Sequence, residues 1–274
     1  MTFDGLVFEV LYWGALALTV WAFVDALIRP AAGYVAAGKL TKPGWAAITG
    51  LAAVIIYFWD ELWGILRSLF AGLTDAKRRT ERDFRYGLAV AVGSIPIAIV
   101  GLAFRHEIEG PLRSLWVVGT ALIVWSGVMW VADRTASQDR GEDDFALPDG
   151  LAMGITQCVA LIPGVSRSGA TIAAGLFRGL DRVTVTRMSF FLAIPALTAA
   201  GLLEAVTKAS DISSGIGWGP TLVGTVVSFI VAYAAVAWFL RYVARHTFSL
   251  FIVYRVILGI VVLAVVATGL TGAR

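Results

Sequence analysis

Long apolar runs separated by short charged loops dominate this sequence. A helix needs roughly 20 consecutive apolar residues to cross about 30 Å of hydrocarbon, and most of the runs approach that length. Only 15% of the residues are charged, whereas about 25% is usual in a soluble domain. The sequence therefore predicts an all-α, polytopic membrane protein with about seven transmembrane helices. The predicted helices cover residues 5–28, 45–58, 87–104, 115–132, 188–206, 221–240 and 248–267.

Lysine and arginine residues are distributed unequally between the two sets of loops. If residues 60–86 face the cytoplasm, loops 133–149, 178–187 and 241–247 lie on the same side. These four loops hold 13 Lys and Arg residues, against seven on the other side. The positive-inside rule favours this orientation, provided that segment 150–180 enters and leaves the membrane on one side. We therefore expect a multi-pass protein of the bacterial inner membrane.

The hydrophilic connection 133–149 is the expected boundary between two halves of the membrane region. Its acidic residues Glu142, Asp143 and Asp144 lack the glycine-turned spacing of a calcium loop, so a solvated linker is favoured over a metal site. The single cysteine, Cys158, gives no basis for a Cys-based zinc site. No soluble domain is predicted that would carry a basic face, so we expect no nucleic-acid partner.

The apolar segment 150–180 is interrupted. Its first part ends at Ile162 and corresponds to roughly 20 Å of helix, which is too short to cross the hydrocarbon. A Pro-Gly pair at 163–164 then stops the helix, and Ser166 or Ser168 is a good N-cap for a second one. The pattern predicts a re-entrant helix–loop–helix. Such backbone is tolerated at membrane depth where it is buried in protein or lines a polar cavity.

The residues around this break have the chemistry of a phosphate site. A helix N-terminus presents unpaired N–H groups and the positive end of the helix dipole. Arg167 offers a planar, permanently charged fork for phosphate oxygens. The alternative is that Arg167 tethers neighbouring helices, but an arginine in hydrocarbon is a functional hypothesis by default. Gly164 and Gly169 permit close backbone approach. Hydroxyl groups, one of which a base could activate as a nucleophile, come from Ser166, Ser168 and Thr171.

Other polar residues in apolar segments leave two interpretations open. Arg255 either neutralises a carboxylate or reaches a bound phosphate, because an unpaired arginine in a membrane is costly. Gln157 either orients the loop or is a buried polar tether. Asp25 and Glu9 are candidate acidic groups in the first apolar segment, although Asp25 also stands four residues before Arg29 and is able to pair with it.

The stretch Pro163-Gly164-Val165-Ser166-Arg167-Ser168-Gly169-Ala170-Thr171 resembles the P-G-x-S-R-S-G-x-T motif of the bacterial undecaprenyl-diphosphatase family, the bacitracin-resistance type. The similarity covers roughly residues 55–274. It implies hydrolysis of a 55-carbon isoprenyl diphosphate, which recycles the lipid carrier of cell-wall synthesis. It also implies an inverted-repeat fold, a divalent cation (Mg or Ca), and a homodimer as one assembly. Other similar stretches are 154–158, 189–195, 57–59 and Tyr254-Arg255.

Carried over position by position, the resemblance implies that Ser166, Arg167 and Thr171 are the catalytic residues. The metal ligands remain unassigned. The predicted substrate-binding residues are Gly164, Ser168, Gly169, Gln157 and Arg255.

The first 54 residues depart from the family pattern. The family's first repeat has a glutamate-rich E-x-x-x-E stretch and a P-x-S-S-x-G-H loop, whereas residues 1–54 hold Glu9 as their single glutamate and no histidine. They are similar instead to a small uncharacterised bacterial membrane protein family. We therefore predict two parts, a divergent membrane segment 1–54 and a diphosphatase-like domain 55–274. The alternative function is a lipid-carrier binder or transporter that retains the phosphate cradle without the chemistry.

Overall fold

The computed structural model describes residues 51–214 and 218–268. Regular secondary structure in these residues is helical, apart from one isolated bridge between Arg140 and Leu180. The chain divides into two compact units, residues 1–53 with 199–235 and residues 54–198 with 236–274. The predicted helix 5–28 and the start of the helix at 45–58 lie outside the described residues. The predicted boundary after residue 54 remains a prediction.

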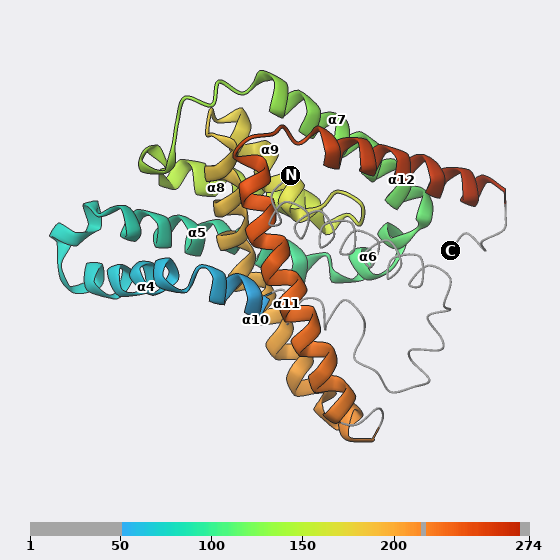
Figure 1. The fold of residues 1–274 in the computed structure, drawn as a ribbon, viewed down its shortest axis with the longest axis horizontal. Helices are drawn as coiled ribbons and strands as arrows, with labels where there is room; N and C mark the ends of the chain where they lie inside the picture. Colours follow the sequence, from blue (N-terminus) through green and yellow to red (C-terminus); the bar gives the residue numbers. More distant parts are fainter. Residues whose placement is uncertain (1–50, 215–217, 269–274) are drawn as a thin grey trace, which may run out of the picture. The chain divides into compact units, whose positions relative to one another are not determined.

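The described helices overlap the predicted apolar segments (Figure 1), although the helix over 188–206 extends from Arg182 to Ser214. The predictions at 87–104, 115–132, 188–206, 221–240 and 248–267 correspond to α5, α7, α10, α11 and α12. The α-helices are α4 (Trp59–Thr74), α5 (Arg82–Ala103), α6 (Arg105–Glu109), α7 (Leu115–Thr135), α8 (Leu147–Gln157), α9 (Arg167–Phe177), α10 (Arg182–Ser214), α11 (Trp218–Val243) and α12 (Ser249–Ala267). The 3₁₀ helices are η1 (Ala76–Thr80), η2 (Pro111–Arg113), η3 (Glu142–Asp144) and η4 (Cys158–Leu161).

Four helical stretches are long and apolar enough to cross a membrane. They are Arg82–Ala103, Leu115–Thr135, Val226–Val243 and Ser249–Ala267, counted among the described residues. Helix α8 with η4 forms a shorter apolar stretch, Leu147–Leu161. The fold is therefore all-helical with several candidate membrane spans, as the sequence predicts.

Small residues allow the helices of the larger unit to approach closely. At the crossing of α5 and α8, a Cβ on Gly154 would lie 2.0 Å from the Gly93 carbonyl oxygen. Helices α7 and α12 run side by side (Figure 1), and a Cβ on Gly259 would lie 2.9 Å from the carbonyl oxygen of Gly119. Glycine contacts of this kind are typical of helix packing in membranes, where close backbone approach replaces the hydrophobic driving force. Substitution at these glycines would separate the helices that support α8.

The α8–α9 hairpin lies in the core of this unit. Its side chains pack against the first turns of α10 and against α5, and the residues between them are almost fully excluded from solvent. This burial gives the loop between α8 and α9 a rigid support on several sides. The buried residues include Met153, Ala170, Ile172, Ala173, Leu176, Val185, Met188 and Leu192.

The connection from residue 133 to residue 149 is folded against the helices. Asp133 is 7% exposed and Phe145 is 1% exposed, so the prediction of a solvated linker is wrong for these residues. The physical reason is that Asp133 is held by long-range contacts with Arg182 (Nε to Oδ1, 2.7 Å) and with the Phe248 amide (3.1 Å). The prediction is correct for Asp143, whose side chain is 91% exposed.

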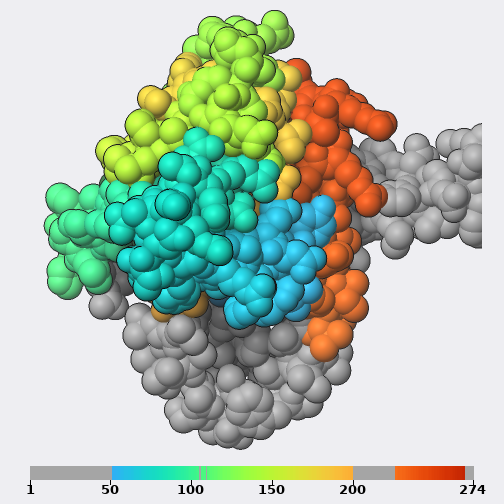
Figure 2. All heavy atoms as spheres, turned by 90° about the vertical axis from the view of Figure 1, so that its left-hand side faces the viewer, coloured from blue at the N-terminus to red at the C-terminus, as the bar shows by residue number. Residues whose placement is uncertain are grey.

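Three of the four loops predicted to share one side of the membrane, 60–86, 133–149 and 178–187, contact one another. Figure 2 shows α4 and α5 (blue to cyan) on the same face as the segment after α7 (yellow-green). These contacts agree with the predicted grouping of the loops, while the membrane side that they face remains a prediction. They run from Arg85 to the Asp143 carbonyl (3.2 Å), from Arg140 to the Arg178 carbonyl (2.9 Å), from Arg187 to Glu142 (2.7 Å) and from Arg187 to Glu61.

Candidate functional site

The break between α8 and α9 forms a short loop with two unusual backbone positions. Helix α9 begins at Arg167 with Ser166 as its N-cap, so the structure has Ser166 of the two predicted N-caps, Ser166 and Ser168. Gly164 has a φ of 101° and Ser166 a φ of 73°. A Cβ on Gly164 would lie 2.5 Å from the Val118 carbonyl oxygen, so this position needs glycine for both its φ and its space. We call residues 163–168 the phosphate loop.

The N-terminus of α9 is arranged as an anion site. The Ser166 hydroxyl accepts a hydrogen bond from the Gly169 amide (3.3 Å). The amides of Arg167 and Ser168 belong to the first helical turn and have no intrahelical acceptor. Free amides at a helix N-terminus, together with the helix dipole, favour a bound anion such as phosphate.

Arg167 is the arginine of the phosphate loop, and it is partly buried. Within the residues that the structure describes, its guanidinium makes no hydrogen bond or ion pair. The interpretation of Arg167 as a tether between helices therefore has no support in the described part of the chain. A guanidinium left without a protein partner is suited to an anionic ligand.

The predicted site residues lie on two different faces of α9. Ser168 is exposed, whereas Thr171 is fully buried and donates a hydrogen bond to the Ser189 hydroxyl (2.7 Å). Thr171 Oγ1 also lies 3.1 Å from the carbonyl oxygens of Arg167 and Ser168. Thr171 is thus joined to α10, and in this arrangement its hydroxyl secures the first turn of α9.

A cavity of about 200 Å³ opens on the other face of α9. It brings together the predicted residues Ser166, Ser168, Gly169 and Arg255, but it does not include Arg167, Thr171 or Gln157. The hydroxyl oxygens of Ser166 and Ser168 are 3.3 Å apart in this region. The rest of the lining is largely aromatic and apolar, with Met129, Ile172, Phe239, Phe248, Phe251 and Tyr254.

Arg255, from α12, binds the backbone of the phosphate loop. Its Nη2 donates to the carbonyl oxygens of Gly164 (2.7 Å) and Val165 (2.9 Å). Its Nε donates to the Ser126 hydroxyl on α7 (3.2 Å). Neither a carboxylate nor another charged group is among these partners, so backbone carbonyls satisfy this intramembrane arginine.

Gln157, the last residue of α8, is fully buried. Neither its amide nitrogen nor its amide oxygen has a hydrogen-bond partner among the described residues. An unpaired buried amide is unfavourable, so the surroundings of Gln157 call for a polar partner.

The model of the family described as Bacitracin resistance protein BacA matches residues 44–261 of this chain. The chain belongs to this family. The resemblance inferred from the motif at 163–171 is therefore confirmed. A second model, described as Protein of unknown function (DUF2516), matches residues 1–84.

Several relatives of this BacA-family chain carry the same name, undecaprenyl-diphosphatase. Undecaprenyl-diphosphatase 3 of Frankia casuarinae is 55% identical over 221 residues, which are 81% of this chain and 80% of that protein. Undecaprenyl-diphosphatase of Cutibacterium acnes is 46% identical over 233 residues, or 82% of each chain. Undecaprenyl-diphosphatase of Mycobacterium ulcerans is 45% identical over 234 residues, or 84% of each chain. Together with the candidate spans, membership of this family identifies a multi-pass membrane protein.

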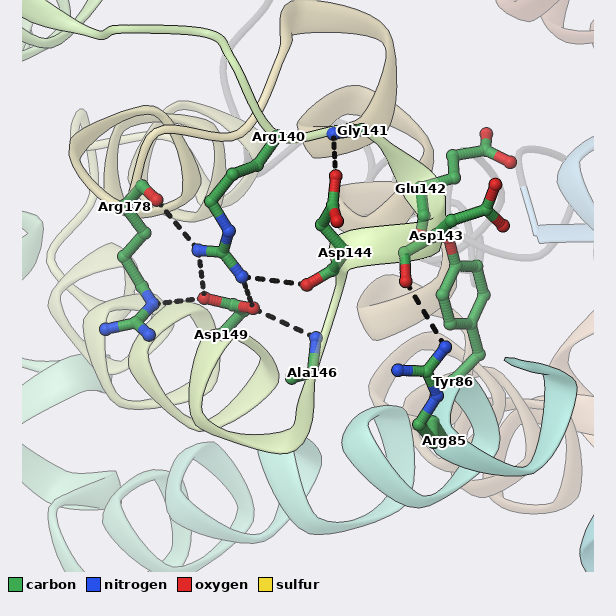
Figure 3. A network of polar contacts seen from close by, with 10 residues as sticks. All are labelled: Arg85, Tyr86, Arg140, Gly141, Glu142, Asp143, Asp144, Ala146, Asp149 and Arg178. Atoms are coloured by element: carbon green, nitrogen blue, oxygen red, sulfur yellow. Dashed lines mark hydrogen bonds and ion pairs between the residues drawn. The ribbon is translucent and has the colours of Figure 1, made fainter. Parts of the chain in front are cut away.

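A buried ion-pair network in this BacA-family chain was not foreseen from its sequence (Figure 3). The Asp149 carboxylate, at the start of α8, is fully buried and accepts from Arg140 Nη2 (2.7 Å), from Arg140 Nη1 (3.1 Å), from Arg178 and from the Ala146 amide (2.9 Å). Burial alone would raise the pKa of Asp149, but these hydrogen bonds outweigh burial and hold the pKa below its ordinary value. The signal in the sequence was an aspartate at the third position of a helix, where it is able to cap the N-terminus.

The donors of the phosphate loop suit an anion and do not form a cation site. Hydroxyls, amides and a guanidinium are present, and within the described residues no group of three His, Cys, Asp or Glu side chains is placed to hold a metal ion. The predicted acidic candidates Glu9 and Asp25 lie outside the described residues. His246 is exposed and stacks on Tyr242 with ring centroids 4.5 Å apart.

Proposed function

We propose that this chain hydrolyses undecaprenyl diphosphate to undecaprenyl phosphate and phosphate, and so recycles the lipid carrier of cell-wall synthesis. Family membership over residues 44–261 and relatives named undecaprenyl-diphosphatase support this activity. The same names do not favour the alternative of a binder without chemistry. The observation that carries the proposal in the structure is Arg167, a partly buried guanidinium beside a helix N-terminus with no partner in the described chain.

The phosphate loop supplies charge neutralisation for the reaction. Arg167 and the first amides of α9 bind the terminal phosphate, and they stabilise the charge that develops when the phosphoanhydride bond breaks and water adds to phosphorus. The Ser166 hydroxyl lies at the same helix terminus and is the candidate nucleophile or phosphate ligand. Gly164 and Gly169 let the loop pack closely against α7, where Val118 and Met129 occupy the space that a Cβ would need. Thr171 acts in this proposal by holding the first turn of α9 against α10 through its hydrogen bond to Ser189.

The finer architecture is also a proposal. About seven transmembrane helices and a re-entrant helix–loop–helix over residues 150–180 fit a bacterial inner-membrane enzyme whose phosphate loop lies in the membrane. The 11-residue lengths of α8 and α9 support this arrangement, because each corresponds to roughly 16 Å of helix. Cysteine accessibility labelling in spheroplasts tests it: introduced cysteines at Asp143 and at Arg245 should be labelled from the same side.

Cation dependence and assembly follow from the family resemblance and remain predictions. Chelation with EDTA should abolish phosphate release, and Mg²⁺ or Ca²⁺ should restore it. Because the described carboxylates form no metal site, we assign no step to the ion. Light scattering of the purified protein in detergent should give the mass of a homodimer.

The decisive experiment measures phosphate release from undecaprenyl diphosphate by the purified full-length chain. The parent should be active, and Arg167→Ala should lower kcat/KM by at least ~100-fold, a typical loss for one donor to a developing oxyanion. Arg134→Met, which removes an exposed arginine at the end of α7, is the matched control and should retain activity. If the parent is inactive but still binds the lipid, the alternative function, a lipid-carrier binder without the chemistry, is favoured instead.

A further inference from the structure

The backbone of the phosphate loop is held in a conformation that it would not adopt alone. Ser166 is not a glycine, yet its φ is 73° and its ψ is 122°. Such a conformation is sparsely populated for a residue with a Cβ and persists where the surroundings determine it. Gly164, two residues earlier, also has a positive φ. Something outside the loop must therefore fix residues 164–166.

Arg255 makes the contacts that fix them. One nitrogen, Nη2, donates to the two consecutive carbonyls that precede Ser166, at 2.7 Å from Gly164 and 2.9 Å from Val165. The other side of the guanidinium is anchored through Nε to Ser126, which is fully buried and donates to the Leu122 carbonyl (2.6 Å). The close packing of α7 against α12 thus sets the position of the guanidinium, and the guanidinium sets the position of the loop.

Holding the carbonyls also orients the amides. In a trans peptide the N–H points away from the C=O, so the Ser166 N–H points away from Arg255. The Val165 amide is used within the loop, since it donates to the Ile162 carbonyl (3.2 Å). The Ser166 amide has no acceptor in the described part of the chain. It is therefore available, with the first amides of α9, to an anion.

We propose that Arg255 is a positioning residue of the phosphate loop, which holds Gly164 and Val165 so that the amides after them bind the diphosphate. The proposal rests on the proposed function of the loop. It assigns Arg255 a different task from Arg167: Arg255 binds protein carbonyls, and Arg167 binds the substrate. Arg255 acts through hydrogen-bond geometry, and its charge is of secondary importance for binding.

Substitutions that separate geometry from charge test this proposal. Arg255→Gln removes the charge but keeps an amide group with two N–H donors for the two carbonyls. Arg255→Met introduces a side chain of similar length to glutamine that has no hydrogen-bond donor. Arg255→Lys keeps the charge on a single compact centre. Ser126→Ala removes the anchor without touching the loop. Arg134→Met, remote from the loop, controls for the loss of one arginine.

The first measurement is the affinity of inorganic pyrophosphate for each full-length variant by calorimetry, because it needs no turnover. Arg255→Met should weaken binding about tenfold, Ser126→Ala and Arg255→Gln about threefold or less, as expected for the loss of one or more hydrogen bonds. Equal losses in Arg255→Gln and Arg255→Met, with parent-like binding in Arg255→Lys, would show a direct charge contact and overturn the proposal. Parent-like binding in Arg255→Met would overturn it as well.

Turnover of undecaprenyl diphosphate gives the second measurement and separates this inference from the proposed function. In an active parent, methylguanidine should partly restore the kcat/KM lost in Arg255→Ala, whose short side chain leaves space for it, and the melting temperature in detergent should show that this variant is folded. Absence of rescue in a folded Arg255→Ala would count against positioning. An inactive parent with tight pyrophosphate binding would sink the proposed function, yet the order of the binding affinities would still decide the role of Arg255.

Discussion

The two ends of α8 are built on opposite principles. At its start, the fully buried Asp149 carboxylate is surrounded by Arg140, Arg178 and a backbone amide. At its end, the equally buried Gln157 amide has no partner in the described residues, and Arg167 across the loop also lacks one. Saturated polar groups stabilise a fold, whereas buried polar groups without partners cost stability and are retained where a ligand supplies what is missing.

The two ends of α8 therefore differ in what they contribute: the start to stability and the end to function. The ion pairs lie in the connections and at the helix ends beside them, together with Tyr86, which donates to the Glu142 carbonyl (2.5 Å). The side chains of Gln157 and Arg167, which lack partners among the described residues, lie on either side of the break between α8 and α9. We therefore expect substitutions at the start of α8 to change the melting temperature and substitutions at its end to change catalysis. Each prediction below tests this division.

The largest expected effect is on stability, from Asp149→Ala. Removing the carboxylate leaves Arg140 and Arg178 without their shared partner, and breaking a buried ion pair typically costs 3–5 kcal/mol. Because the two arginine side chains are 31% and 38% exposed, water solvates them in part, and we expect about 3 kcal/mol. The free energy of unfolding in mixed detergent micelles measures it. Asp143→Ala is the matched control, since that side chain is 91% exposed, and it should be nearly neutral.

A loss of catalysis without loss of stability is expected at the other end. Arg167→Ala should lower kcat/KM at least ~100-fold, equivalent to about 2.7 kcal/mol of transition-state stabilisation. Its melting temperature should be unchanged or higher, because an unpaired and partly buried charge is removed. If Arg167→Ala lowers the free energy of unfolding as much as Asp149→Ala does, the two ends of α8 do not differ in the way proposed. Arg178→Met supplies the contrast, with a lower melting temperature and parent-like kcat/KM in the folded fraction.

Gln157→Leu should raise the stability of the protein and lower its catalytic activity. Leucine has a similar volume and removes two unsatisfied polar atoms, so the free energy of unfolding should rise by about 1 kcal/mol. Phosphate release should fall, since the amide is the predicted contact to substrate. Met153→Leu, one turn earlier and equally buried, is the control and should change neither property by much. A destabilised but fully active Gln157→Leu would indicate a purely structural amide.

Much of the fold was predictable because the hydrocarbon thickness limits helix length. The apolar runs located α5, α7, α11 and α12 to within a few residues, and local chemistry limited the N-cap of α9 to Ser166 or Ser168. The partners of the polar residues were not predictable. Arg255 binds Gly164, 91 residues away in the sequence, and a sequence pattern offers no means of choosing those carbonyls over a phosphate.

The same limit explains why residues 133–149 were taken for a solvated linker. A cluster of acidic residues without its partners resembles any exposed loop. The aspartates at the two ends of this connection, Asp149 and Asp133, pair with Arg178 and Arg182, which lie 29 and 49 residues further along the chain. The burial of Thr171 was likewise not predictable, because its hydrogen-bond partner Ser189 lies on α10, a different helix.

The smallest expected effect concerns Glu142, which lies in the same network as Asp149 but titrates in the opposite sense. Burial raises the pKa of Glu142 above its ordinary value, although Arg187 and Arg82 oppose this. The folded state therefore takes up a proton at higher pH than the unfolded chain. Its stabilising contribution appears as the pH falls through the raised pKa and is complete below the ordinary value of about 4.3. The lowered pKa of Asp149 has its effect below about 3.9, outside that window.

Melting temperatures of the parent and Glu142→Gln at pH 7, 6 and 5 isolate this contribution. The variant cannot titrate at this position and mimics the protonated carboxyl, so any stability advantage that it has at pH 7 should shrink as the pH falls. We expect a change of less than about 1 kcal/mol, since the shift is partial and the side chain is 23% exposed. A difference that grows toward pH 5 would mean that the ion pair with Arg187 (2.7 Å) outweighs burial. Glu142 would then belong with Asp149 among the saturated carboxylates that stabilise the fold.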